Sequence, residues 1–182
     1  IRYFLLRQVP FGNDGDFSHQ AMVHRLNGDL ANDLGNLCQR VMSMVFKNCD
    51  GKIPQAHILE ETDIKFILAI SDSIEELRQL IAAQSFNLAL ELIWRHVAEA
   101  NRYVDEQAPW ALRKTDPPRM ESVLYTLTEV IRNLAILTTP FMPQSMEMMF
   151  DQLSVPEENR DIAHLGLKYG VVSGTALPGK PT

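Results

Sequence analysis

Three polar side chains recur every four residues in a stretch with helical periodicity. They are Asn32, Asn36 and Arg40, and each step of four turns about 40° around a helix axis, so the three form one stripe. Asparagine suits a helix interior poorly because its amide competes with the backbone for hydrogen bonds. An amide can both donate to and accept from the edge of an unpaired base, and arginine adds forked donors and charge. The stripe is therefore either a solvated helix face or a surface that reads bases.

Two tryptophans occupy different sequence environments. Trp110 directly follows Pro109 at a helix end, where a large ring is easily presented at a surface. Burial of Trp110 against a neighbouring helix is an equally open alternative. If exposed, its ring would be a stacking platform for a base, worth about 1–3 kcal/mol. Trp94 lies among leucine, isoleucine and valine and is expected in the core.

Residue patterns for catalysis or metal binding are not found. The sequence has no glycine-rich phosphate loop, no His-Glu-x-x-His and no serine nucleophile elbow. His19 and His24 are five positions apart, which turns about 140° around a helix axis and separates their rings. Cys38 and Cys49 lack both a Cys-x-x-Cys pair and a histidine at ligand spacing. We therefore expect no catalytic residue and no metal site, with both cysteines reduced.

The elements that must position these side chains are predicted to be helices. Ser18 can cap a long helix whose leucines and valines recur at three-to-four spacing, and Gly51 and Pro54 end it. Further helices are expected at 1–7, 63–83, 85–105, 116–139 and 143–153, with a connector at 9–16 and an extended tail from 159. With no alternating strand pattern, these helices predict an all-α antiparallel bundle.

Composition limits the kind of partner. The 182 residues are 46% hydrophobic, which suffices for one domain with a buried core. No apolar run is long enough to span a bilayer, so we expect no membrane partner. The net charge of −6 disfavours nucleic-acid binding by general phosphate attraction, so any RNA contact must be local and directed at bases. The chain begins in a helix without an initiator methionine, and we interpret it as part of a longer protein.

Linked motifs along nearly the whole chain resemble a known family. They are Ile1–Arg7, Gly15-Asp16-Phe17-Ser18, Asn27–Leu37, Ala100-Asn101-Arg102-Tyr103 and Ala108-Pro109-Trp110. This set resembles the C-terminal half of bacterial-type methionyl-tRNA synthetases, which are class I enzymes. The resemblance implies a stem-contact connector at 1–17, a helical anticodon-binding domain at 18–155 and a tail packed on the surface at 156–182. The HIGH and KMSKS motifs of the family's catalytic domain are not in this sequence.

The resemblance also implies roles for the polar stripe and the Pro-Trp pair. Asn36 and Arg40 match contacts to the methionine anticodon CAU, and Asn32 matches a supporting position. Pro109 and Trp110 match the pair whose indole stacks on the wobble cytosine. The expected partners are tRNA(Met) and the chain's own catalytic domain, which would use ATP with magnesium, while this chain binds no cofactor itself. A monomer in the cytoplasm is expected, with the mitochondrial matrix as an alternative.

Two rival interpretations remain at this point. The anticodon domains of synthetases for leucine, isoleucine, valine or cysteine share the bundle architecture, but the combination of Asn36, Arg40 and Pro109–Trp110 argues against them. The other rival is a helical protein-interaction module, for which the acidic balance would suit a basic partner.

Overall fold

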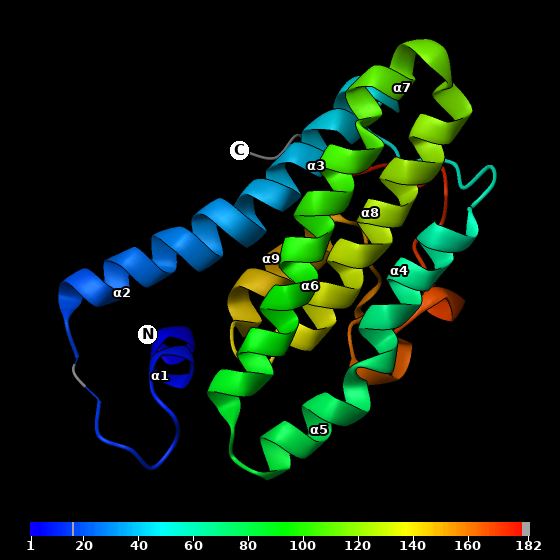
Figure 1. Cartoon of the computed structure of the whole chain (residues 1–182). Coiled ribbons are helices and arrows are strands. Elements are labelled where there is room, and N and C mark those ends of the chain that lie inside the picture. The colour runs from blue at the N-terminus through cyan, green and yellow to red at the C-terminus, as the bar shows by residue number, and fades with distance from the viewer. Residues whose placement is uncertain (16, 180–182) are drawn as a thin grey trace.

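Two long helices form the centre of the molecule. In this computed structural model, which describes residues 1–15 and 17–179, α6 (Phe86–Gln107) and α8 (Pro117–Thr138) pack side by side (Figure 1). Every residue of α8 from Ser122 to Thr138 is buried, as expected of a helix covered on all sides. Around it lie α3 (Asn36–Asn48), α4 (Glu61–Asp72) and α9 (Pro143–Gln152). The predicted all-α bundle is confirmed, and the described residues contain no β-strand, only an isolated bridge between Lys52 and Ala176.

The predicted long helix after Ser18 is continuous but not uniform. The Ser18 hydroxyl accepts from the backbone N–H of Ala21 at 3.3 Å and begins α2 (His19–Arg25). A π-helical segment, Leu26–Gly35, then leads without a break into α3. Its wider i→i+5 turn was not expected from the sequence. The rotation around the helix axis from Asn32 to Asn36 therefore differs from the roughly 40° that four residues of an ideal α-helix give.

The helix expected over 63–83 is two helices. Between α4 and α5 (Ile74–Ala82), the hydroxyl of Ser73 donates to the carbonyl of Ile70 at 2.7 Å, a local bond that competes with helix continuation. At its other end, α4 begins with a capping box in which Glu60 and Asp63 each accept from the other's backbone N–H.

A short helix absent from the sequence prediction joins the two central helices. Ala108 ends α6 in the left-handed conformation, with φ 43° and ψ 58°. Pro109 then starts α7 (Pro109–Thr115), and Asp116 caps α8 by accepting from the backbone N–H of Arg119. Figure 1 shows α7 at the top of the molecule, at the opposite end from α5.

The first helix packs on the bundle. In α1 (Arg2–Gln8), the ring of Tyr3 lies 4.9 Å from that of Trp94, and its hydroxyl donates to Asp29 at 2.5 Å. Trp94 is 7% exposed, which confirms its expected place in the core. Asp16 of the expected connector lies outside the described residues.

The expected extended tail is instead folded into short turns. The 3₁₀ turns are Glu157–Asn159, Ile162–His164 and Leu167–Tyr169. Arg132 of α8, fully buried beside Glu129, donates to the carbonyls of His164 and Gly166. The tail therefore satisfies a buried charge rather than merely covering the surface. Residues 180–182 lie outside the described part. No helix of the described residues is long and apolar enough to cross a membrane.

Candidate functional site

The polar stripe of Asn32, Asn36 and Arg40 lies on the solvent side of its helix. Asn32 and Asn36 are exposed and Arg40 is half-buried, whereas Leu37 and Val41 are in the core. Within the described part of the chain, neither asparagine amide has a side-chain hydrogen bond. Both amides are thus free to donate to and accept from a ligand.

Arg40 connects the stripe to the end of α6. Its Nη2 lies 2.6 Å from Oδ1 of Asp105, which is on the last turn of α6, five residues before Trp110. The carboxylate is largely exposed, so this ion pair contributes little to stability and can rearrange at small cost. The contact brings the stripe and the start of α7 to the same end of the bundle.

The tryptophan at the start of α7 is on the surface. Trp110 is 51% exposed, and the preceding Pro109 is buried. The alternative of a core Trp110 is therefore wrong. Arg113 and Lys114 follow on α7 and are exposed, three and four residues after Trp110, which places them on its side of the helix. Neither has an ion pair within the described residues.

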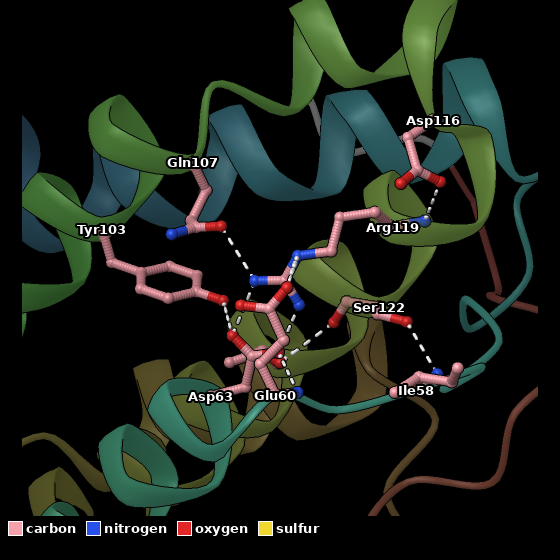
Figure 2. A network of polar contacts seen from close by, with 9 residues as sticks. Ile58, Glu60, Asp63, Tyr103, Gln107, Asp116, Arg119 and Ser122 are labelled. Carbon is pink, nitrogen blue, oxygen red and sulfur yellow. Dashed lines mark hydrogen bonds and ion pairs between the residues drawn. The ribbon is translucent and has the colours of Figure 1, made fainter.

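A buried polar network lies next to this turn and was not predicted from the sequence (Figure 2). Arg119 pairs with Asp63, whose side chain is 0% exposed, and donates to Oε1 of Gln107 at 2.8 Å. The Tyr103 hydroxyl donates to the same carboxylate at 2.5 Å. Burial alone would raise the pKa of Asp63, but hydrogen bonds from Arg119, Tyr103 and the Glu60 backbone outweigh it and hold that pKa below its usual value.

These groups are suited to recognition rather than to bond making. Exposed amides, a cation and an open aromatic face can bind a base by its edge and its ring. The exposed members of the site include no histidine and no nucleophile beside a base. No group of histidine, cysteine, aspartate and glutamate in the described residues is arranged to hold a metal ion. His19 and His24 are both exposed, and burial raises the pKa of the Cys38 thiol to about 12.

Comparison with known families decides between the interpretations. A family model described as the anticodon binding domain of methionyl tRNA ligase matches residues 53–166. The chain belongs to this family. A second model, tRNA synthetases class I (M), matches residues 1–42. The anticodon domain of methionyl-tRNA ligase is thus the architecture of this chain, and the two rivals, another synthetase and an interaction module, are set aside.

Relatives of known name agree with this assignment. The chain is 48% identical to a methionine–tRNA ligase from Mesorhizobium japonicum and 50% identical to one from Brucella suis, in each case over 98% of the chain and 34% of the relative. A crystal structure of the apo methionyl-tRNA synthetase of Mycobacterium tuberculosis is 43% identical, with a TM-score of 0.92 over 100% of this chain and 37% of that one. The same enzyme bound by methionyl-adenylate gives a TM-score of 0.93 over 100% of this chain and 36% of that one. The chain spans about a third of the length of these relatives.

Proposed function

We propose that this domain recognises the CAU anticodon of tRNA(Met) through two groups of residues, the polar stripe and the Pro109–Trp110 pair. The observation that carries the proposal is the half-exposed indole of Trp110 at the end of the bundle that Arg40 reaches through Asp105. A large aromatic ring with half of its surface open, at the same end of the bundle as Arg40, offers a face on which an unpaired base can stack.

Each residue has a distinct role in this proposal. Trp110 offers its face to the wobble cytosine, and buried Pro109 fixes the backbone from which the ring projects. Asn36 and Arg40 contact base edges, where an amide can match a donor and an acceptor together. Asn32, one step back on the stripe, supports Asn36.

The charge distribution supports local contacts only. Arg40 is already paired with Asp105, so a base that contacts Arg40 must either displace this carboxylate or bind beside it. A base edge with matching donors and acceptors is therefore favoured over a phosphate, which the Asp105 carboxylate repels. Arg113 and Lys114 provide cations for the phosphates that flank the stacked base. In a chain of net charge −6, this small basic group keeps phosphate attraction close to the site.

The proposal for the whole protein follows from the longer relatives. A catalytic domain attached to this one would use ATP with magnesium to activate methionine and transfer it to tRNA(Met). Residues 1–17 would join the two domains, 18–155 would read the anticodon and 156–182 would pack against the bundle. The named relatives are bacterial, which supports a cytoplasmic enzyme, and we propose that it acts as a monomer.

The proposal is tested by separating recognition from activation in the full-length enzyme. Asn36→Ala and Arg40→Ala should weaken charging of tRNA with a CAU anticodon while leaving methionine-dependent pyrophosphate exchange nearly unchanged. Arg78→Ala is a matched control, because Arg78 is an exposed arginine on α5 at the other end of the bundle. If adenylate formation falls as far as charging, the two residues support the fold and the proposed roles are wrong.

A further inference from the structure

The short helix that carries Trp110 is tied at both ends to one residue. Before α7, Nη2 of Arg119 donates to Oε1 of Gln107 at 2.8 Å. After α7, the backbone N–H of Arg119 donates to Oδ1 of Asp116 at 3.1 Å. Figure 2 shows both contacts. The residues that directly precede Ala108 and directly follow α7 are therefore both held by Arg119.

The turn into α7 needs such support. Ala108, directly after Gln107, has φ 43° and ψ 58°, a left-handed conformation that is unfavourable for a residue with a Cβ atom. Conformations of this kind persist only where the surrounding contacts fix them. Because Pro109 and Trp110 follow at once, a change at Ala108 would reorient the indole.

Arg119 is itself held in place and can serve as a fixed anchor. Its side chain is only 12% exposed, and Nη2 also donates to Oδ1 of the fully buried Asp63 at 3.0 Å. Asp63 accepts further hydrogen bonds from Tyr103 and from the backbone of Glu60. A buried pair with its remaining lone pairs satisfied has one well-defined geometry.

We propose that Arg119, anchored by Asp63, is a positioning residue for anticodon recognition. Through Gln107 it fixes the Ala108 turn, and so sets the direction in which Trp110 presents its ring. This inference rests on the proposed function, because it requires Trp110 to contact a base.

The same tether acts close to Asp105. Asp105, which pairs with Arg40, lies on the last turn of α6 two residues before Gln107. Holding that turn against α8 therefore also holds the backbone from which Asp105 meets Arg40.

Gln107 is the position at which to break the tether. Arg119→Ala would leave the Asp63 carboxylate buried without its partner, which risks unfolding the domain. Gln107→Ala keeps the Asp63–Arg119 pair whole and removes only the acceptor at the end of α6. Gln107→Glu keeps an acceptor oxygen on a side chain of the same length. Gln79→Ala is the matched control, since Gln79 is an exposed glutamine on α5.

The experiment measures the affinity of the 182-residue chain for an anticodon hairpin RNA with a CAU loop, together with the melting temperature. Each glutamine variant is made in two backgrounds, with Trp110 and with Trp110→Ala. With Trp110 present, Gln107→Ala should weaken binding about three- to tenfold, a coupling in the range of residues linked through a shared backbone shift, and in the Trp110→Ala background it should cause no further loss. Gln107→Glu and Gln79→Ala should both bind like the unmodified chain.

Other outcomes overturn the inference in distinguishable ways. An equal loss from Gln107→Ala in both backgrounds, or no loss in either, would mean that Gln107 does not act through Trp110. Failure of Gln107→Glu to restore affinity would mean that the hydrogen bond from Arg119 is not the cause. If Trp110→Ala itself leaves affinity unchanged, the proposed function fails at this residue and the positioning role fails with it.

Discussion

Replacing Trp110 by alanine separates a recognition role from a structural one. If the indole stacks on the wobble cytosine, the change removes about 1–3 kcal/mol of binding free energy, which is a roughly 5- to 150-fold loss of affinity for the CAU hairpin. The effect on stability should be small, because the ring is 51% exposed before it is removed. A cost of about 1 kcal/mol would lower the melting temperature of a domain of this size by roughly 2–4 °C.

Trp94 provides the matched control for this prediction. It is 7% exposed, contacts the ring of Tyr3 and donates from its indole N–H to the carbonyl of Asp29 at 3.2 Å. Trp94→Ala should therefore cost roughly 3–5 kcal/mol of stability. The fraction that remains folded should bind the hairpin with nearly normal affinity.

The assay pairs hairpin binding with thermal unfolding on the same preparations. Trp110→Phe should recover part of the affinity lost in Trp110→Ala, because a smaller ring still offers a face. A large thermal shift for Trp110→Ala, with RNA affinity and anticodon preference unaltered, would refute the stacking role.

Two further predictions concern charge. Replacing Arg113 and Lys114 together by alanine should reduce the slope of log affinity against log salt concentration, by about 0.7 for each phosphate of single-stranded RNA that is no longer neutralised. The preference for CAU should stay intact. An unchanged slope would show that neither cation contacts a phosphate. The pKa of Asp63 in the folded state lies below its ordinary value of 3.8. Its charged form therefore stabilises the fold above pH 3.8, and this contribution is lost as the pH falls through the pKa of the folded state. Urea unfolding should accordingly show Asp63→Asn less stable than the unmodified chain near pH 7, with the gap narrowing below pH 3.8; a gap independent of pH would contradict this.

Local signals in the sequence were sufficient for most helices and for the exposed part of the site. Ser18 and Pro117 mark helix starts through interactions within one turn, and Gly51 marks an end in the left-handed conformation. The exposure of Asn32 and Asn36 also follows from periodicity, because the leucine stripe fixes which side of the helix is buried. The π-helical segment shifts their angle without burying either.

Features that depend on contacts between distant residues could not be predicted in this way. Asp63 and Arg119 are 56 positions apart, and only the packing of α4 against α8 brings them together. The left-handed turn at Ala108, which directly precedes Pro109 and Trp110, has no glycine to signal it. The seven residues of α7 are too few to show a clear helical period. The folded tail depends on the buried charge of Arg132, which looks like an ordinary surface residue in sequence.

The most direct test of anticodon recognition is a competition between hairpin RNAs that differ only in the first anticodon base. The unmodified chain is titrated with a labelled CAU hairpin, which is then displaced by unlabelled CAU or UAU hairpin at the same salt concentration. We expect CAU to compete more strongly by about 1–3 kcal/mol, the usual cost of one wrong base, or roughly 5- to 150-fold. Equal competition by the two hairpins would mean that this domain does not distinguish cytosine from uracil at the wobble position, and the proposed recognition of the CAU anticodon would be wrong at that base.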